Sequence, residues 1–457
     1  MNRIATRALA VLILAVVLLA GCVFFLCEYI AQSGQWVTAS GSPHVYADGK
    51  LDAGTITDRD GTVLVDLTDG RSYIDNAAVR EAMLHWTGDR QGNVQVPFIE
   101  HYKDALLDHD FVDGLYAYGD AKAAIGLTLS SRVQTTALEA MGEKVGTVAV
   151  YNYKTGEILC AVTTPTFDPE DLPDIAGDTT GAYTGVYVNR FTQSRYIPGS
   201  VFKIATLAAA LECIPDIEHQ TFRCDGVYEI QKGDITCLKA HGEQTLKQCF
   251  SNSCNCAFAQ IVEQIGSDRL ASYVELFGMT APVSFDGITT VSGNFEVEGA
   301  TGEQIAWSGI GQHKDQVNSC AYLRFIGAVA GGGIGAEPYV VSQVRVGSTC
   351  TYEAKTQRTD RVLSRETARL LREYMQNNVQ VKYGADNFPG LTVCAKSGTA
   401  EVGGGKKPNA LFTGFVADEE YPLAFFIVVE EGGFGAETCI PIIGQILQEC
   451  VLVMDGN

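Results

Sequence analysis

The sequence predicts an α+β protein in which helices cover a five-stranded antiparallel sheet. Residues 146–164 form two apolar runs joined by a tight turn, and residues 391–430 form three apolar runs with short connections. These patterns are typical of a β-hairpin and a β-meander. The segment between them, roughly residues 165–390, is interpreted as mostly helical. Strands near both ends with helices between them indicate a sheet covered by helices.

The N-terminus predicts a membrane anchor. Residues 8–26, "ALAVLILAVVLLAGCVFFL", carry no charge and follow Arg3 and Arg7. About 20 apolar residues span a bilayer, and basic residues favour the cytoplasmic side. We therefore expect residues 1–30 to form one helix in membrane lipid, with a cytoplasmic N-terminus and an extracytoplasmic remainder. Two alternatives stay open, namely a cleaved signal peptide and a lipoprotein with Cys22 as the lipidated residue.

A small α+β domain is expected at residues 31–126, between the anchor and the larger domain at residues 127–457. In "GTITDRDGTVLVD" two alternating runs flank the turn Arg59-Asp60-Gly61, which predicts two strands. The larger domain is expected to begin near Ser130 and Ser131, which can cap a helix.

Composition excludes one class of partner and leaves one pairing of cysteines open. The formal net charge is −21 over 457 residues, and no block of Lys and Arg occurs, so nucleic-acid binding is not expected. Most of the 14 cysteines stand singly in apolar runs and are expected to be buried. Cys224 and Cys237 flank a predicted hairpin and form either a disulfide or two free thiols. No CxxC pair or His cluster indicates a metal site.

The literal triplet Lys154-Thr155-Gly156 lies between the two strands of the first hairpin. These residue types are typical of a tight turn, so we expect an exposed hairpin tip there and no functional site.

A first candidate site lies in "YIPGSVFKIATLAAALE". Pro198-Gly199 turns the chain, Ser200 stands at the start of an apolar helix, and Lys203 follows one turn later on the same face. A serine hydroxyl becomes nucleophilic when a nearby base takes its proton, and a buried lysine can be that base. The alternative is a helix-capping serine and a surface lysine.

Two further stretches carry residues suited to the same chemistry. In "FSNSCNCAFAQI", Ser253 and Asn255 precede a helix, where a hydroxyl can relay a proton and an amide can bind a peptide; the alternative is again helix capping.

In "TVCAKSGTAEV", Lys396 supplies positive charge, and Gly398 lets a substrate approach the strand. Ser397 and Thr399 supply hydroxyls for a carboxylate, and the Thr399 N–H can join that of Ser200 in an oxyanion hole. Another S-x-N, at residues 292–294, lies in a Gly-rich loop without a helix and is rejected.

Together these stretches form the ordered set S-x-x-K, S-x-N, K-[ST]-G. The chain resembles the class B penicillin-binding proteins, which are monofunctional peptidoglycan D,D-transpeptidases with a fold like that of serine β-lactamases. "GTITDRDGTVL", "TGEILCAVTTPTFDP", "NRFTQSRYIPGSVFK" and "SGIGQ" also resemble family segments. Three departures stand out. Ala53 replaces the first Arg of the N-terminal motif, the segment after "GIGQ" lacks the usual Thr-Pro run, and K-S-G replaces the commoner K-T-G.

The resemblance implies the activity and the role of each site residue. Ser200, activated by Lys203, attacks the carbonyl between the two terminal D-alanines of a stem peptide, and β-lactams acylate the same hydroxyl. Ser253 and Lys396 return a proton to the leaving D-alanine. The substrate is held by Asn255, Ser397, Gly398 and Thr399.

The resemblance also implies the partners of the protein and leaves two other functions open. Peptidoglycan stem peptides and β-lactams are the expected ligands, and no metal or organic cofactor is implied. The small domain corresponds to the family's dimerisation or pedestal domain. A membrane peptidoglycan glycosyltransferase is a candidate partner. The alternatives are a serine β-lactamase or β-lactam-sensing receptor, and a catalytically silent cell-wall scaffold.

Overall fold

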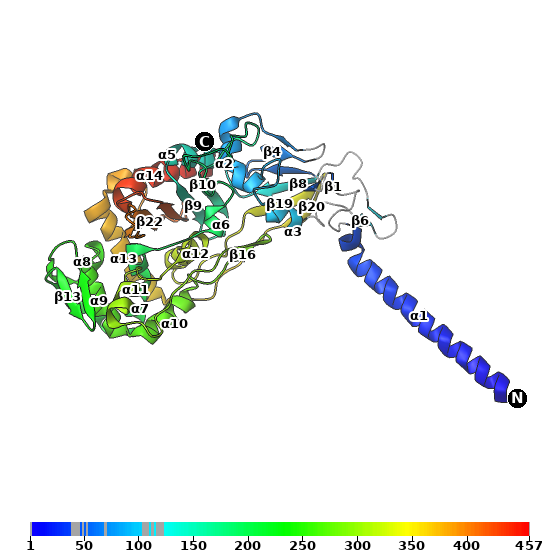
Figure 1. The fold of residues 1–457 in the computed structure, drawn as a ribbon, viewed down its shortest axis with the longest axis horizontal. Helices are drawn as coiled ribbons and strands as arrows, with labels where there is room; N and C mark the ends of the chain where they lie inside the picture. Colours follow the sequence, from blue (N-terminus) through cyan, green and yellow to red (C-terminus); the bar gives the residue numbers. More distant parts are fainter. Residues whose placement is uncertain are drawn as a thin grey trace.

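The structure is a computed structural model that describes residues 2–37, 46–47, 50–51, 54–67, 71–102, 109–110, 114–115 and 123–456. It contains the predicted five-stranded antiparallel sheet (Figure 1), in the order β10-β9-β23-β22-β21. The strands are β9 (Gly146–Asn152), β10 (Ile158–Thr164), β21 (Val393–Ala400), β22 (Asn409–Val416) and β23 (Leu423–Val429). The hairpin and the meander predicted from the sequence are therefore confirmed, and β21 is an edge strand of this sheet.

Side chains on each strand alternate between two apolar cores, because successive residues of a strand point to opposite faces. On β23, Phe425 and Ile427 belong to the core beneath α5 (Ser131–Met141) and α14 (Gly435–Met454). Phe426 and Val428 belong to the core on the α12 (Ser319–Ala330) side. The ring of Phe426 lies 5.5 Å from that of Tyr322 on α12. Figure 1 shows the sheet between these helical layers, with α5 and α14 above it and α12 below.

The segment 165–390 is less helical than the sequence predicts. It contains the helices α6 (Arg190–Gln193), α7 (Lys203–Cys213), α8 (Leu246–Ser251), α9 (Asn255–Ile265), α10 (Ser267–Phe277), α11 (Gly302–Gly309), α12 and α13 (Arg365–Asn378). Short two-stranded ladders lie between them: β11 (Arg195–Tyr196) with β18 (Val317–Asn318), β12 (Thr221–Cys224) with β15 (Gly242–Thr245), β13 (Val227–Ile230) with β14 (Gly233–Thr236), and β16 (Ser284–Phe285) with β17 (Ile288–Thr289). Strands this short give little periodicity for a sequence to reveal.

A second sheet of six strands lies on the N-terminal side of the molecule, in the order β20-β19-β8-β3-β4-β5. Its strands are β3 (Thr55–Thr57), β4 (Val63–Asp66), β5 (Ser72–Tyr73), β8 (Ala123–Leu127), β19 (Val341–Val346) and β20 (Thr349–Glu353). The predicted β3–β4 pair is confirmed. The sheet contains strands from both sides of residue 127, where the larger domain was expected to begin. β19, from the larger domain, pairs antiparallel with β8, which lies at the end of the smaller one.

Motif residues outside the site tie the N-terminal segment to the rest of the protein. Asp58 accepts backbone N–H groups from Asp60 and Thr62 and a hydroxyl from Ser131, at 3.0, 2.9 and 2.6 Å. It thus fixes the β3–β4 turn against the start of α5. As predicted, the Ser130 hydroxyl caps α5.

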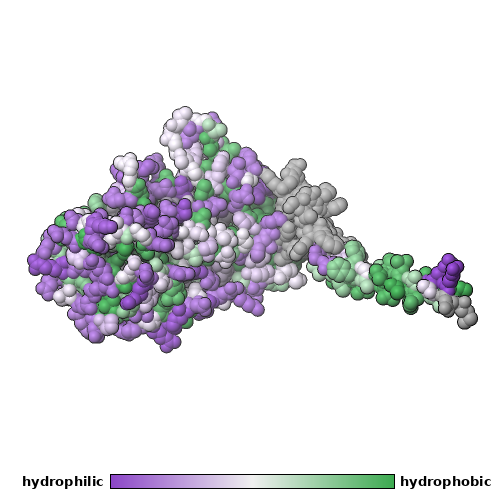
Figure 2. Space-filling view, turned by 60° about the horizontal axis from the view of Figure 1, so that its bottom comes forward, coloured by the Kyte–Doolittle hydropathy of each residue, from purple (hydrophilic) through white to green (hydrophobic). Residues whose placement is uncertain are grey.

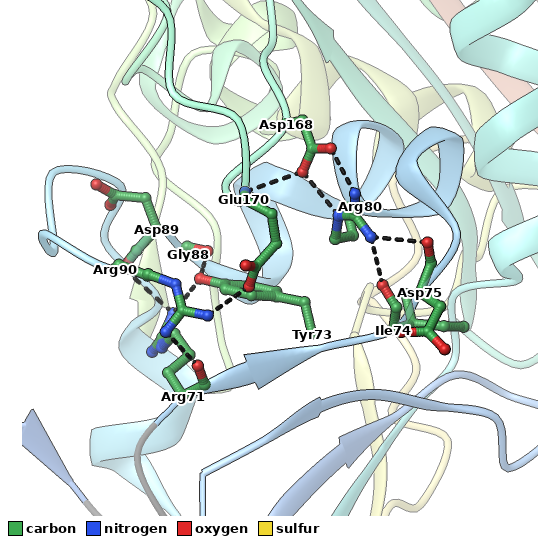
Figure 3. A network of polar contacts seen from close by, with 10 residues as sticks. All are labelled: Arg71, Tyr73, Ile74, Asp75, Arg80, Gly88, Asp89, Arg90, Asp168 and Glu170. Carbon is green, nitrogen blue, oxygen red and sulfur yellow. Dashed lines mark hydrogen bonds and ion pairs between the residues drawn. The ribbon is translucent and has the colours of Figure 1, made fainter.

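The helix α2 (Ala77–Thr87) attaches to the segment after β10 through Arg80. Figure 3 shows its guanidinium between the Asp168 carboxylate and the carbonyl oxygens of Ile74 and Asp75. Both bonds to Asp168 are short, at 2.7 and 2.6 Å, and both to the carbonyls are 2.8 Å. The Asp-Pro motif that follows the hairpin is therefore an anchor for α2.

The remaining described elements complete the N-terminal region. α1 (Asn2–Val37) is long and apolar, and residues 3–32 could cross a membrane by length and composition. Figure 2 shows it as an apolar rod. The helix α3 (Pro97–His101) and the ladders β1 (Tyr46–Ala47) with β2 (Lys50–Leu51) and β6 (His109–Asp110) with β7 (Gly114–Leu115) follow. Ala53 lies outside the described residues.

Candidate active site

Ser200 lies in a 3₁₀ turn, Gly199–Phe202, that continues directly into α7. The turn is held from two sides. The N–H of Gly199 donates to the carbonyl of Gly311 at 2.8 Å, and the hydroxyl of Tyr322 donates to the carbonyl of Val201 at 2.8 Å. The Ser200 side chain remains partly exposed, as a nucleophile needs.

Two glycines bring this turn against the edge strand β21. Gly199 has φ +54°, and a Cβ there would lie 2.7 Å from the carbonyl oxygen of Thr399. A Cβ on Gly398 would lie 3.0 Å from a Val201 methyl and 3.1 Å from the Pro198 carbonyl oxygen. The sequence interpretation assigned the space beside Gly398 to substrate. In the structure the nucleophile turn occupies it, so the glycine permits close packing of turn and strand.

Lys203 is fully buried and points at Ser200. Its Nζ lies 3.1 Å from Ser200 Oγ, 2.7 Å from the backbone oxygen of Ser253, and 2.7 Å from Asn255 Oδ1. The ring of Phe258 lies 5.4 Å below it. A lysine on the first turn of an apolar helix is thus held by the two residues of the S-x-N motif.

Ser253 occupies the short segment between α8 and α9 in a left-handed conformation, with φ +51°. That conformation costs a non-glycine residue about 1–3 kcal/mol and persists where surrounding contacts impose it. Here they direct Ser253 Oγ to 3.2 Å from Lys203 Nζ and 3.0 Å from Lys396 Nζ. The hydroxyl therefore bridges the two lysines.

Lys396 points from β21 into the same cluster and is 1% exposed. Its Nζ also donates to the backbone oxygen of Ser397 at 2.8 Å. Burial lowers the pKa of Lys203 to about 8. Burial, and secondarily the charge of Lys203, lower the pKa of Lys396 well below its usual value. Both shifts favour neutral amines, which are the forms that can accept a proton.

Ser397 and Thr399 are partly exposed on β21. The Tyr383 hydroxyl accepts the Ser397 N–H at 2.9 Å and lies 3.0 Å from Ser397 Oγ. The Ser397 N–H thus points outward from the edge strand. Because alternate residues of a strand direct their N–H groups to the same side, that of Thr399 also points outward, toward the nucleophile turn.

Several residues that position the site were missed by sequence reasoning. Tyr383 ends a π-helical turn, Val379–Tyr383, that follows α13. Tyr322 holds the nucleophile turn from α12. Gly311, φ +85°, lies so close to Gly199 that a Cβ would be 2.2 Å from its carbonyl oxygen. The "SGIGQ" segment could have indicated Gly311, whereas nothing local marks either tyrosine.

The first rejected motif forms the predicted turn, but its tip is only partly exposed, because Lys154 is exposed whereas Gly156 is buried against the Glu337 carbonyl. Lys154-Thr155-Gly156 forms the turn between β9 and β10, and the Asn152 side chain accepts the N–H groups of Lys154 and Thr155 at 2.9 and 3.1 Å. Asn294 pairs with Gln316 in an isolated bridge. In the described part of the chain, neither motif forms a hydrogen bond with Ser200, Lys203 or Lys396.

Comparison with known sequences matches residues 146–448 to the penicillin binding protein transpeptidase domain. Stage V sporulation protein D of Bacillus subtilis is 29% identical over 347 residues, covering 71% of this chain but 52% of that protein. The peptidoglycan D,D-transpeptidase PbpA of Mycobacterium tuberculosis is 27% identical over 344 residues, covering 67% of each. The chain thus spans about half to two thirds of these relatives.

Solved structures share the fold. The D,D-transpeptidase domain of a peptidoglycan glycosyltransferase from Eggerthella lenta superposes with a TM-score of 0.75 at 25% identity, covering 88% of this chain and 98% of that one. The ceftriaxone acyl-enzyme complex of M. tuberculosis penicillin-binding protein A gives 0.75 at 22% identity, covering 87% and 98%. Since the family match covers about two thirds of the residues, this chain belongs to the penicillin-binding protein transpeptidase family.

Proposed function

We propose that this protein is a serine D,D-transpeptidase that cross-links peptidoglycan and is acylated by β-lactams at Ser200. The observation that carries the proposal is the buried Lys203 amine at 3.1 Å from Ser200 Oγ. A buried amine whose pKa is lowered to about 8 can take the serine proton near neutral pH.

In the first half-reaction, Ser200 Oγ attacks the carbonyl carbon between the two terminal D-alanines while Lys203 takes its proton. The C–N bond breaks, and the departing D-alanine amine receives a proton through Ser253, whose hydroxyl contacts both lysines. General acid–base groups of this kind contribute ~10²–10⁴-fold. The outward N–H of Thr399 and that of Ser200 would stabilise the oxyanion, and one such donor is worth ~10²–10³-fold.

In the second half-reaction, an amine from a neighbouring stem peptide attacks the ester carbonyl. A new C–N bond forms while the amine gives up one proton to the Lys203–Ser253–Lys396 cluster, and the same proton is passed to Ser200 Oγ as its bond to the acyl group breaks. A β-lactam undergoes only the first half-reaction. Its leaving nitrogen stays attached to the acyl group and keeps water and amines away from the ester.

Substrate recognition is assigned to Asn255, Ser397 and Thr399, whereas Gly398 serves the site by letting the nucleophile turn pack on β21. The Asn255 Nδ2 donates to the Thr236 carbonyl at 2.9 Å, so contact with an acyl chain requires exchange of that bond. Tyr383 holds Ser397 through its N–H and Oγ. Thr399 and Ser397 would bind the terminal carboxylate.

The topology is also a proposal. Residues 1–30 would anchor the chain in lipid with the N-terminus inside, residues 31–126 would form a pedestal, and residues 127–457 would be the extracytoplasmic transpeptidase domain. Labelling of the exposed Cys350 by a membrane-impermeant maleimide in intact cells is expected; labelling only after lysis would contradict this orientation.

A membrane glycosyltransferase that polymerises glycan strands is the proposed partner. A penicillin-binding protein 2 of Helicobacter pylori has been solved in complex with MreC, so a protein with this fold binds a second protein. Failure of the full-length chain to co-purify with such a polymerase from mild detergent would contradict the partnership.

Intact mass spectrometry of the detergent-solubilised protein after penicillin treatment tests the activity. We expect one stable adduct on the wild type over hours and none on Ser200→Ala. Rapid return to the free mass with hydrolysed drug would identify a β-lactamase. A stable adduct on an enzyme that forms no dimeric stem peptides would identify a receptor, and no adduct would identify a silent scaffold.

A further inference from the structure

Three cysteines and a histidine converge directly beside the S-x-N motif. They are Cys224, Cys237, His241 and Cys254, and their ligand atoms all lie within 4.8 Å of one another. The sequence indicated no metal cluster because the four residues are separated as C-x₁₂-C-x₃-H-x₁₂-C. No two ligands share the close CxxC spacing by which zinc sites are usually found.

The fold explains why distant residues meet. Cys224 ends β12, Cys237 follows β14, and His241 precedes β15. The N–H of Cys237 donates to the Gly226 carbonyl at 2.9 Å, and that of His241 donates to the Cys224 carbonyl at 3.0 Å. These bonds close two adjoining ladders, and Cys254 reaches the same point from the segment between α8 and α9.

Three of the six distances between the ligand atoms are close to those of a tetrahedron around zinc, and the other three are no longer than 4.8 Å. With Zn–S of about 2.3 Å and Zn–N of about 2.0–2.1 Å, tetrahedral angles give S···S of about 3.8 Å and S···N of about 3.6 Å. The structure has 4.0 Å between Cys237 Sγ and Cys254 Sγ, and 3.5 and 3.6 Å from His241 Nδ1 to Cys224 and Cys237. A disulfide needs about 2.05 Å. Every described cysteine is free.

The surroundings also fit a bound cation. Cys224 and Cys254 are fully buried, whereas Cys237 and His241 are partly exposed and give the ion a way in. Cys254 caps α9, and its sulfur accepts the Ala257 N–H at 3.4 Å. Such a bond orients a thiolate and stabilises its charge.

We propose that Cys224, Cys237, His241 and Cys254 bind one Zn²⁺ ion, and that this ion fixes the segment carrying Ser253 and Asn255. Three sulfurs and one imidazole are a closed structural zinc set with no position left for water or substrate. The ion therefore takes no part in bond making, and its four ligands are positioning residues.

The link to the active site is the peptide chain itself, since Cys254 stands between Ser253 and Asn255. Both neighbours contact Lys203 Nζ at 2.7 Å, through the Ser253 carbonyl and Asn255 Oδ1. The left-handed Ser253, φ +51°, needs external restraint. Zinc bound to Cys254 and to three residues of the two ladders would supply that restraint.

Metal analysis of the full-length protein, purified in detergent and desalted without chelator, tests the site. We expect one zinc per chain in the wild type and in Ser200→Ala, and less than about a tenth of that in His241→Ala and Cys224→Ala. Cys249→Ala is the matched control, because Cys249 is a buried thiol of the same region whose sulfur donates to the Gln244 carbonyl at 3.9 Å and lies outside the four-residue cluster. His241→Cys, which restores a four-ligand set, should keep the ion.

Cobalt substitution gives a second, spectroscopic readout of the ligand set, and its main result comes from the wild type. Co²⁺ exchanged into the wild type should show the intense absorption of a tetrahedral thiolate complex, which His241→Cys alters and Cys249→Ala does not. A metal-free wild type whose Cys224 and Cys237 resist alkylation until reduced would overturn the proposal in favour of a disulfide. Equal zinc in the wild type and both alanine variants would overturn the ligand set.

The positioning role is tested separately from the ligand set. Removing zinc with a chelator should slow penicillin acylation about 10–100-fold, the loss typical when supporting groups around a metal are removed. Added Zn²⁺, but not Mg²⁺, should restore the rate. Unchanged acylation after complete zinc loss would overturn the positioning role. Zinc content does not depend on acylation, so failure of the proposed transpeptidase activity would leave a one-zinc result standing.

Discussion

Lys203 contacts Ser253 twice, with Nζ 2.7 Å from its backbone oxygen and 3.2 Å from its hydroxyl. Ser253 therefore has two roles in the proposed reaction. It holds the Lys203 amine in place beside Ser200, and its hydroxyl would pass the proton to the leaving D-alanine. The left-handed backbone of Ser253 makes both contacts possible at once.

Two substitutions distinguish the effect of the Ser253 hydroxyl on the reaction from the effect of its left-handed backbone on stability. Ser253→Ala and Ser253→Gly both remove the proton relay, so each should slow penicillin acylation by ~10²–10⁴-fold. Only glycine relieves the left-handed strain, so the glycine variant should exceed the alanine variant in free energy of unfolding by about 1 kcal/mol. Stopped-flow acylation and urea denaturation measure the two effects. Equal stability of the variants would show that the positive φ carries no strain.

Acylation should depend on pH through Lys203, whose pKa burial lowers to about 8. The neutral amine is the base, and its fraction rises with pH, so the acylation rate should climb through a midpoint near 8. At pH 6 about 1% of the amine is neutral, and the rate should be about 100-fold below the plateau. Lys406→Ala, which removes an exposed lysine, is the control and should keep the profile. A flat profile from pH 6 to 9 would exclude Lys203 as the base.

Packing of the nucleophile turn on β21 predicts a large effect from one methyl group. Gly199→Ala places a Cβ 2.7 Å from the Thr399 carbonyl oxygen, whereas Gly142→Ala at nearly the same φ meets its nearest atom at 3.9 Å. Both variants incur strain from a positive φ, and the Gly142 backbone, with ψ −132°, lies outside the left-handed helical region, so Gly142→Ala should be at least as strained as Gly199→Ala. Only Gly199→Ala should also separate Ser200 from Thr399 and lose most acylation. Similar acylation rates in the two variants would contradict this packing.

The Arg80–Asp168 pair in Figure 3 should stabilise the protein without serving the reaction. A double-mutant cycle with Arg80→Ala and Asp168→Ala is expected to give a coupling free energy of about 1–3 kcal/mol at pH 7. The Arg80 hydrogen bond lowers the pKa of Asp168, so this stability is present above the unfolded pKa of about 3.9 and is lost as pH falls through the folded one. Thermal unfolding at several pH values measures it. Loss of penicillin acylation in the folded single variants would show that the pair also acts on the site.

The sequence reveals the parts of the site that local patterns encode. Ser200 and Lys203 share a helix face, and the turn at Lys154-Thr155-Gly156 is bounded by apolar strands, so both were predictable from spacing. Tyr383 and Tyr322 were not, because their hydroxyls reach backbone groups 14 and 121 residues away. The periodicity of the sequence does not predict contacts between residues so far apart.

The same limit explains what was missed in the fold. The strands β12–β15 are four residues each, too short to alternate recognisably, and their cysteines could only be assigned to a bridge or to free thiols. Zinc ligands brought together by two ladders, each closed by backbone hydrogen bonds, require the three-dimensional structure to be seen.

The pairing of β19 with β8 has a consequence for how the protein is made. Val341 pairs with Leu127, and a chain emerges from the ribosome at about 5–20 residues per second. The edge of β8 must therefore wait tens of seconds, with its hydrogen-bonding groups unpaired, until β19 arrives. An exposed edge strand is a template for wrong partners. The unpaired edge of β8 is therefore a segment that a chaperone could protect during synthesis, and the six-stranded sheet is complete only after the helix α7 has been synthesised.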